Sequence, residues 1–307
     1  MQKSHRRKRL RINEVSPAAE VILIIAMILF TLVIILPLIL VIIISVSSTE
    51  SLANHGFTYF PSSFSLEAYR FLFKAGGTIL RSYANTIFYT VVGTLMALLV
   101  MSMFAYVLSL KAFRPRRVIA FIAFFTTLFW GGLVPEYILY TQYLHFNDTI
   151  WIFLLPNIVN AFHVIILRTF IQTSIPDSLY ESAKIDGANE WTIYTRIVLP
   201  LSKAGLATIG LFEVVARWNN WFTGLLYVEN AKLVPIMTYL QRIQKSLEYM
   251  KSNMDLAGPD VVELMKNLPS ESARMAIAVI AIAPLMVMYP FFQKYFVKGM
   301  TIGSVKG

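Results

Sequence analysis

Two opposite charges, Glu213 and Arg217, lie four positions apart in an otherwise apolar stretch of the sequence. On a helix this spacing puts both side chains on one face, where they can pair. The same face of a continuous helix would also carry an amide, an aromatic and a small residue, namely Asn220, Trp221 and Gly224. A bare charge at the bilayer centre costs about 2.5–3.5 kcal/mol on insertion scales, so we expect this stripe to face the protein interior or a watery path.

Two interpretations of this stripe are open. An aromatic face suits the C–H groups of a sugar ring, and amides and charges suit its hydroxyls, so the stripe would line a path for a carbohydrate cargo. Alternatively, Glu213 and Arg217 form a structural ion pair that joins helices. A second polar set, Asn157 and Asn160, can face the same path, and we expect His163 beside them to be an interhelical hydrogen-bond donor rather than a cargo ligand.

The elements that must position these groups are long uncharged runs, which indicate a membrane protein. The chain has 307 residues, of which 57% are apolar and 14% charged, whereas an average soluble domain is about 25% charged. Crossing ~30 Å of hydrocarbon takes ~20 helical residues. We predict an all-α membrane protein with six transmembrane helices, in the runs Val21–Thr49, Ser82–Leu110, Val118–Pro135 extended by Tyr137–Leu144, Thr149–Leu167, Ala204–Val228 and Met275–Gln293.

The distribution of Lys and Arg predicts that both termini lie in the cytoplasm. With this orientation, basic residues are roughly twice as dense in the inner segments as in the outer ones. Residues 1–20 are then a basic cytoplasmic tail that binds anionic lipid, followed by a first transmembrane helix at 21–46 and an extracytoplasmic segment at 47–81. We expect no binding of nucleic acid by so short a tail.

Several kinds of chemistry are excluded by the residues that the chain contains. There is no cysteine, so thiolate chemistry and disulfides are ruled out. The four histidines, at 5, 55, 145 and 163, do not have the spacing of metal ligands. Gly76 and Gly77 are not followed by the Gly-Lys-Ser/Thr of a phosphate-binding loop. We therefore expect no metal, no cofactor and no ATP hydrolysis by this chain.

The polar stretch between the fourth and fifth runs predicts a helix, a turn and a second helix. Asp177 is a suitable N-cap for a helix over about 177–186, and Gly187 suits the left-handed position after it. Asn189 would cap the second helix, over about 190–198, and Pro200 would lie in the first turn of the fifth span.

One side of this stretch carries small residues and another carries charged ones. Ala183 and Gly187 keep one side thin, while Glu181 and Lys184 project charges. We expect such a helix to enter a groove on another protein.

The same stretch resembles the permeases of bacterial ABC importers. Their pattern is Glu-Ala-Ala, three residues, Gly, nine residues and Ile-x-Leu-Pro, and only Ser182 departs from it here. Further segments resemble the carbohydrate-importer branch related to the maltose importer, so that the resemblance covers roughly residues 80–307: IDGAN at 185–189, WNNWFTGLL at 218–226 and FFQKYFVKGMTIGSVKG at 291–307.

The resemblance implies the type I ABC importer permease fold, with both termini cytoplasmic. The transmembrane domain would cover 80–296, with a cytoplasmic coupling loop at 176–200, an outer loop at 229–274 and a cytoplasmic C-terminal tail at 297–307. Glu181 would pair with a basic residue of the ATPase. The residues that the resemblance assigns to coupling are Glu181, Ser182, Ala183, Asp186, Gly187, Ile197, Leu199 and Pro200.

Two outer segments carry amphipathic patterns. In 65–73, Ser65 would cap a helix at the membrane interface, with Glu67 in its first turn. In 235–254, apolar residues recur at helical spacing, at Ile236, Tyr239, Leu240, Ile243, Leu247 and Met250. This second helix is either a cap packed on the bundle or a contact for a partner outside the membrane, for which Arg242 and Lys245 are candidates.

The function that we predict is that of a multi-pass permease subunit in a bacterial plasma membrane. It would belong to an ABC importer that translocates oligosaccharides, with a second, homologous permease subunit, two ATPase domains and an extracytoplasmic sugar-binding protein as partners. The cargo would be a neutral oligosaccharide, a uronate oligosaccharide or a complex glycan. The alternatives are an ion-coupled secondary transporter, which predicts an internal repeat that we do not find, a membrane enzyme, and a receptor or scaffold.

The predicted topology can be tested with single cysteines, because the chain has none of its own. A membrane-impermeant maleimide should label cysteines at positions 55 and 255 in intact cells, and cysteines at 114 and 184 only after permeabilisation. Labelling at 184 in intact cells would contradict the topology.

Overall fold

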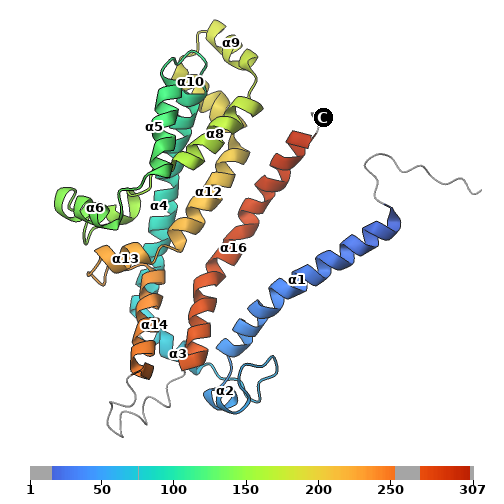
Figure 1. Ribbon diagram of the computed structural model, residues 1–307, viewed down its shortest axis with the longest axis vertical. Coiled ribbons are helices and arrows are strands. Elements are labelled where there is room, and N and C mark those ends of the chain that lie inside the picture. The colour runs from blue at the N-terminus through green and yellow to red at the C-terminus, as the bar shows by residue number, and fades with distance from the viewer. Residues whose placement is uncertain (1–15, 75, 253–269, 305–307) are drawn as a thin grey trace, which may run out of the picture. The chain divides into compact units, whose positions relative to one another are not determined.

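The protein is helical throughout in the computed structural model, which describes residues 16–74, 76–252 and 270–304 (Figure 1). These residues include no strand beyond one isolated antiparallel bridge between Ser47 and Phe64. Most of the predicted basic tail, residues 253–269 of the outer loop and the last three residues lie outside the described ranges. The helices are α1 (Pro17–Ser45), α2 (Thr49–His55), α3 (Glu67–Phe73), α4 (Gly76–Ser109), α5 (Arg116–Leu128), α6 (Leu133–Ile138), η1 (Leu139–Tyr143), α7 (Trp151–Leu154), α8 (Ala161–Ser174), α9 (Asp177–Ile185), α10 (Glu190–Ile193), η2 (Tyr194–Val198), α11 (Leu199–Leu201), α12 (Lys203–Trp218), α13 (Phe222–Tyr227), α14 (Ile236–Ser252) and α16 (Ser270–Ser304), where η marks a π-helix.

The chain divides into two compact units. The first comprises Met1–Leu72 and Gly258–Val279, and the second comprises Phe73–Ala257 and Ile280–Gly307. In the first unit, Ser16 caps α1 by accepting from the Ala19 N–H at 3.3 Å. The amphipathic helix predicted at 65–73 is confirmed as α3, and the Ser65 hydroxyl accepts from the Glu67 N–H at 3.1 Å.

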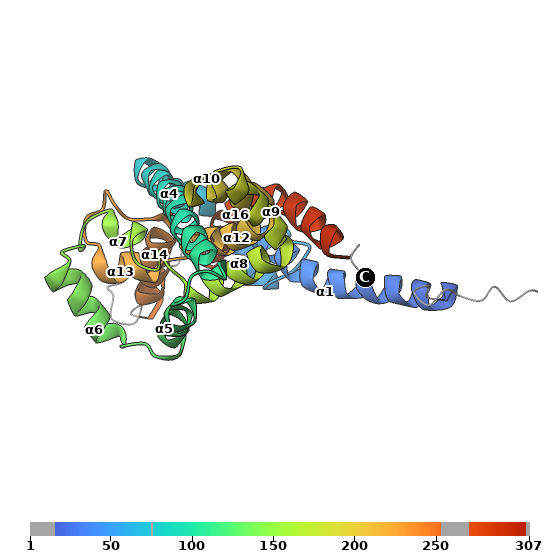
Figure 2. The same cartoon turned by 90° about the horizontal axis from the view of Figure 1, so that it is seen from above.

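The second unit is built around α4, which packs against α8 and α12 (Figures 1 and 2). Ala97, Met101 and Ala105 recur every fourth position on α4 and are fully buried in one core cluster with residues of α8. Small side chains at this spacing let helix backbones approach closely. The second part of α16 joins this unit, because Trp218 Nε1 of α12 donates to the Ala281 carbonyl at 3.0 Å.

The predicted spans agree with the structure at the first two runs and at the last one. α1, Gly77–Ser109 of α4 and Glu271–Pro290 of α16 are long and apolar enough to cross a membrane. The other apolar runs are not single helices. α5 and the segment Leu133–Tyr143 meet at 110°, and Glu190–Leu201 meets α12 at 77°, so the described residues hold three candidate spans, or five if each bent pair crosses the membrane once.

Each break has a local cause. At the first, Gly132 has a φ of +94°, which favours glycine. In the predicted fourth span, Pro156 restricts the residue before it, and Asn157 adopts a φ of +57°, which asparagine tolerates better than most residues. As a result α8 has only 14 residues. The prediction of a continuous helix over Ala204–Val228 is also wrong, because α12 ends at Trp218 and α13 begins at Phe222.

The amphipathic pattern at 235–254 folds as α14, and its apolar face is a packing surface. Ile236, Leu240 and Leu247 are buried, and the helix packs against α4. The Ile236 N–H donates to the Thr86 hydroxyl of α4 at 2.7 Å. Packing on the bundle is therefore an observed role of this face.

Gly224 of α13 lies where α13 packs on α14. It is buried, and a Cβ atom there would clash with the Thr238 hydroxyl and lie 3.1 Å from Pro235 Cδ. Its place in the fold is thus a close contact between helices, which differs from the predicted place on a stripe with Glu213.

Gly224→Ala should lower the stability of the protein by about 1–3 kcal/mol, because the added methyl group overpacks this contact. Thermal unfolding in detergent measures the effect. Gly77→Ala is the matched control, since nothing lies within 4 Å of a Cβ atom at Gly77. Equal unfolding temperatures for the two variants would contradict the assignment of Gly224 to packing.

Candidate functional site

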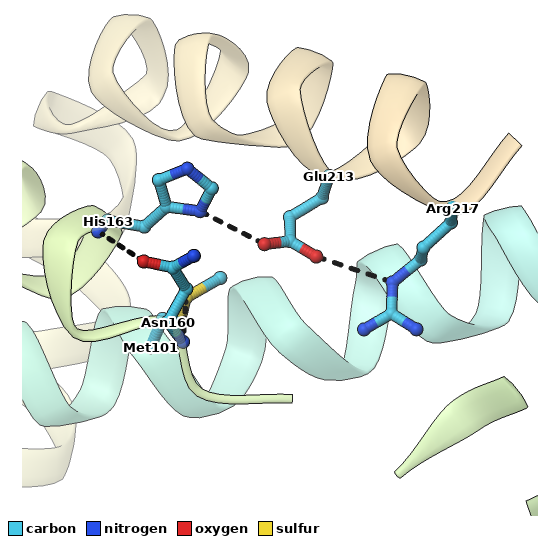
Figure 3. Close-up of polar contacts among 5 residues, drawn as sticks. All are labelled: Met101, Asn160, His163, Glu213 and Arg217. Carbon is cyan, nitrogen blue, oxygen red and sulfur yellow. Dashed lines mark hydrogen bonds and ion pairs between the residues drawn. The ribbon is translucent and has the colours of Figure 1, made fainter. Parts of the chain in front are cut away.

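Glu213 is the centre of a buried polar network that joins two helices. Its side chain is 7% exposed, and its Oε1 lies 3.0 Å from His163 Nδ1 of α8 (Figure 3). Its Oε2 lies 3.3 Å from Arg217 Nε on its own helix α12. Both carboxylate oxygens therefore have a partner, as a charge in an apolar bundle requires. The predicted pairing of Glu213 with Arg217 and the interhelical contact of His163 are both present in the structure.

Arg217 extends the network to α7 and α4. Its Nη1 donates to the Phe153 carbonyl at 3.0 Å. Its guanidinium also lies against Gly93, where a Cβ atom would come within 2.5 Å of Nη1. Sequence reasoning missed Gly93 and the Phe153 carbonyl. A glycine inside the longest uncharged stretch of α4 was the available signal, because a helix-interior glycine often marks a close approach.

Two predicted path residues accept backbone hydrogen bonds where helices begin after the breaks. The Asn160 side-chain oxygen accepts from the His163 N–H at 3.2 Å and caps α8. The Asn220 side-chain oxygen accepts from the Thr223 N–H at 3.2 Å, in the first turn of α13. The network of Glu213 and Arg217 bridges the first of these breaks, since it contacts α7 before the break and α8 after it.

The predicted stripe is therefore split into a buried part and an exposed part. The prediction that all five residues share one helical face is wrong, because α12 ends before Asn220. Glu213 and Arg217 are buried, and Gly224 packs on α14. Trp221 is 37% exposed, and Asn157 and Asn160 are exposed as well. Irregular backbone at membrane depth is tolerated where protein covers it or where it lines a watery cavity.

The two candidates for contact outside the membrane differ in their surroundings. Arg242 Nη2 donates to the Val228 carbonyl at 2.7 Å and lies 3.4 Å from the Gly224 carbonyl, so it holds the end of α13. Lys245 is exposed. Of these two residues, only Lys245 therefore has a side chain exposed for contact with a partner.

The 176–200 loop contains a complete glycine turn. The Ala188 N–H donates to the Ala183 carbonyl at 2.9 Å, and the Gly187 N–H donates to the Lys184 carbonyl at 3.1 Å. With Gly187 at a φ of +77°, these two bonds define a Schellman motif. Asn189 caps α10 as predicted, by accepting from the Thr192 N–H at 2.8 Å. Pro176, rather than Asp177, occupies the N-cap position of α9.

Pro200 lies before the bend that begins the fifth span, and not after it as predicted. It belongs to the continuous segment Glu190–Leu201 and not to the first turn of the fifth span, which starts after the bend at Ser202. The π-helix η2 precedes it, and the Leu199 N–H reaches back to the Tyr194 carbonyl. A wider turn just before a proline accommodates a ring that offers no N–H.

The side of α9 that carries Ala183 faces the core of its own protein. Ala183 is 8% exposed and belongs to the core cluster of the second unit, so its small size serves internal packing. Gly187, the other small residue of this helix–turn, is exposed, and docking of the helix in a groove on another protein stays a prediction. Ile197 and Leu199 also pack on this core. The side chains that point outward include Glu181, Ser182, Asp186 and Ile185, which is 87% exposed.

Charged groups inside the loop are paired with one another. Glu190 accepts a hydrogen bond from the Tyr106 hydroxyl and lies 2.9 Å from Lys184 Nζ. The hydrogen bond from Tyr106, followed by that from Lys184, lowers the pKa of Glu190, so it is a carboxylate at neutral pH. Burial raises the pKa of Tyr180 to about 12, so its hydroxyl stays protonated.

Comparison with known proteins gives matches over nearly the whole chain. The polygalacturonan/rhamnogalacturonan transport system permease protein YtcP of Bacillus subtilis (strain 168) is 38% identical over 281 residues, covering 92% of this chain and 96% of YtcP. Protein LplC of the same organism is 38% identical over 265 residues, 86% of each chain. The arabinooligosaccharides transport system permease protein AraQ, also of that organism, is 26% identical over 249 residues, 80% of this chain and 81% of AraQ. No protein-family model matches the chain.

A solved structure has the same fold. It is the crystal structure of a bacterial ABC transporter involved in the import of the acidic polysaccharide alginate. The TM-score is 0.75 with 31% sequence identity, and the match covers 92% of this chain and 99% of the other.

The buried network predicts how charge removal affects stability. Glu213→Ala should destabilise the protein by about 3–5 kcal/mol, because it leaves Arg217 buried without its carboxylate. Glu213→Gln combined with Arg217→Met removes both charges at similar volume and should recover most of the yield. The measurement is the monodisperse yield and unfolding temperature in detergent. A Glu213→Ala variant as stable as the unmodified protein would show that the pair contributes nothing.

Proposed function

This chain belongs to the permease subunits of carbohydrate ABC importers, and we propose that it is one of two homologous permeases that together pass oligosaccharides across the cell membrane. The observation that carries the proposal is the 38% identity to YtcP over 92% of the chain. A secondary transporter, a membrane enzyme or a receptor would leave this full-length similarity unexplained.

The proposed topology has six membrane crossings with both termini in the cytoplasm. Three long apolar helices, the bent pair of α5 with Leu133–Tyr143, and α12 of the second bent pair support five of the crossings, and the broken segment α7–α8 is proposed as the sixth. Residues 176–200 then lie in the cytoplasm and 229–274 outside. The domain limits are those that the sequence predicts, with a transmembrane domain at 80–296 between a first helix at 21–46 and a tail at 297–307.

The proposed partners are two ATPase domains at the 176–200 loop and a sugar-binding protein outside. The outward side chains of α9, Glu181, Ile185 and Asp186, give this loop a surface of mixed charge and apolar character. Glu181 would meet a basic residue of an ATPase. The exposed Lys245 on α14 is the better candidate for contact with the binding protein, since Arg242 holds the end of α13.

The proposed cargo is an oligosaccharide that contains uronic acid units. YtcP is named for polygalacturonan and rhamnogalacturonan, and the structural relative takes part in the import of alginate. The path would pass the exposed groups at the helix breaks, Asn157, Asn160 and Trp221. Their amides offer hydrogen bonds to hydroxyls, and the indole offers a face to sugar rings. The pair of Glu213 and Arg217 would stabilise the backbone beside these exposed groups.

The coupling role of the loop predicts the effect of two substitutions. Glu181→Lys should reverse the charge offered to the ATPase, reduce its co-purification and abolish ATP-dependent uptake of oligogalacturonides into proteoliposomes. Gly187→Leu should act similarly by disturbing the turn, because a left-handed conformation costs roughly 1–2 kcal/mol for a residue with a Cβ atom. Nothing lies within 4 Å of a Cβ atom there, so the effect is one of backbone conformation.

Matched controls exist for both positions. Ser182→Ala introduces the residue of the family pattern and should behave as the unmodified protein. Gly187→Asn should retain more activity than Gly187→Leu, because asparagine tolerates the left-handed region better. Normal co-purification and uptake with Glu181→Lys would refute docking at this surface, and neutral oligosaccharides taken up in preference to oligogalacturonides would refute the proposed cargo.

A further inference from the structure

The Glu190 carboxylate of the 176–200 loop is bound to the inner end of α4. Tyr106 of α4 donates its hydroxyl hydrogen to Glu190 Oε2. The other carboxylate oxygen, Oε1, lies 2.9 Å from Lys184 Nζ of α9. Glu190 is itself the first residue of α10. One side chain therefore connects α4, α9 and α10.

An aromatic cluster surrounds this tie. The ring of Tyr106 is stacked on that of Tyr180, with centroids 6.4 Å apart and planes at 22°. It also lies 5.6 Å from the ring of Tyr194, whose hydroxyl is 2.7 Å from the Ser102 hydroxyl of α4. Tyr106 is only 4% exposed. The cluster thus packs both arms of the loop against α4.

The contacts between the loop and α4 differ in how they resist sliding. Apolar packing is non-directional, so it holds surfaces together without fixing their register. A hydrogen bond to a charged group is directional and is stronger than one between neutral groups. The second charged tie, between Lys111 and Asp177, joins two side chains that are 74% and 60% exposed, and such pairs contribute little. Lys184 and Glu190 are themselves 49% and 54% exposed, so the firmer charged contact is the hydrogen bond from the buried Tyr106 to Glu190. The hydrogen bond between Ser102 and Tyr194 is a second directional contact, between neutral groups.

From Tyr106 toward its N-terminus, α4 runs back to the region of the helix breaks. Gly93 lies 13 positions before Tyr106, ~20 Å along the helix, and receives the guanidinium of Arg217. Between these points α4 packs along α8 and α12. A displacement applied to the inner end of α4 would reach the breaks through one continuous helix.

We propose that Tyr106, Glu190 and Lys184 are positioning residues that make α4 follow the 176–200 loop when the ATPase moves it. This inference rests on the proposed function. With the contact intact, the loop and the inner end of α4 move as one body. Without it, the loop can slide on the aromatic cluster, and ATP is hydrolysed without an equivalent movement of the helix breaks.

The test uses the complete importer in proteoliposomes with loaded binding protein. Tyr106→Phe removes one hydroxyl and keeps the ring. We expect ATPase co-purification to be unchanged, ATP hydrolysis to stay within about twofold, and transport per ATP to fall by about tenfold or more, as the loss of a charged hydrogen bond implies. Glu190→Gln keeps an oxygen that can accept from Tyr106 but loses the ion pair, so its loss should be smaller.

Tyr180→Phe is the matched control. It removes a hydroxyl from the same aromatic cluster, and that buried hydroxyl has no hydrogen-bond partner among the described residues. Its ratio of transport to ATP hydrolysis should equal that of the unmodified complex. The double variant Tyr106→Phe/Glu190→Gln should lose less than the product of the two single losses, because both changes act on the connected contacts of one carboxylate.

The outcomes separate this inference from the proposed function. Equal coupling ratios for Tyr106→Phe and Tyr180→Phe would overturn the inference, while loss of the ATPase with Glu181→Lys would still support the docking role of the loop. If the Tyr106→Phe complex failed to assemble, the ratio of transport to ATP hydrolysis in Glu190→Gln would decide. An unchanged ratio in that variant would also overturn the inference. A complex of unmodified chains without ATP-dependent uptake would instead refute the proposed function.

Discussion

A carboxylate buried among apolar helices needs a partner for each oxygen, and the arrangement of α4, α7, α8 and α12 follows from how Glu213 meets this need. One oxygen contacts His163 on α8, and the other contacts Arg217, which continues to a carbonyl of α7 and to Gly93 of α4. Unpaired, these charges would be costly in such surroundings. Paired across four helices, they hold the interrupted segment of α7 and α8 against α4 and α12.

The parts of the fold that depend on local signals could be predicted from the sequence. α1 and α4 follow from uncharged length, and the turn at Gly187 follows from a glycine and an asparagine whose roles are set within a few residues. The spacing of Glu213 and Arg217 was sufficient to predict their contact. Pro156 and the pair Asn219–Asn220 mark the helix breaks near Asn157 and Asn219, but such residues also occur in helices that are only kinked, so the sequence does not predict an interruption.

The errors at single residues share one physical reason. A small residue can be required by a partner outside or by a neighbour inside, and the sequence does not distinguish the two. Ala183 is small because α9 packs on its own core, and Gly224 is small because α13 packs on α14. Gly93 makes room for a guanidinium that comes from a helix more than a hundred residues later. Such needs are visible only after the tertiary contacts are known.

The length of α1 has a consequence for the membrane around it. Its uncharged part, Val21–Ser45, extends ~38 Å, whereas the hydrocarbon core of a bilayer is ~30 Å thick. Apolar side chains cover its surface on all sides, so no polar face sets its rotation. A helix whose apolar stretch is longer than the hydrocarbon core relieves this mismatch by tilting or by thickening the lipid locally. The cost is a fraction of a kcal/mol per Å of mismatch. The thickness of the host membrane is therefore a physical variable to which this helix responds.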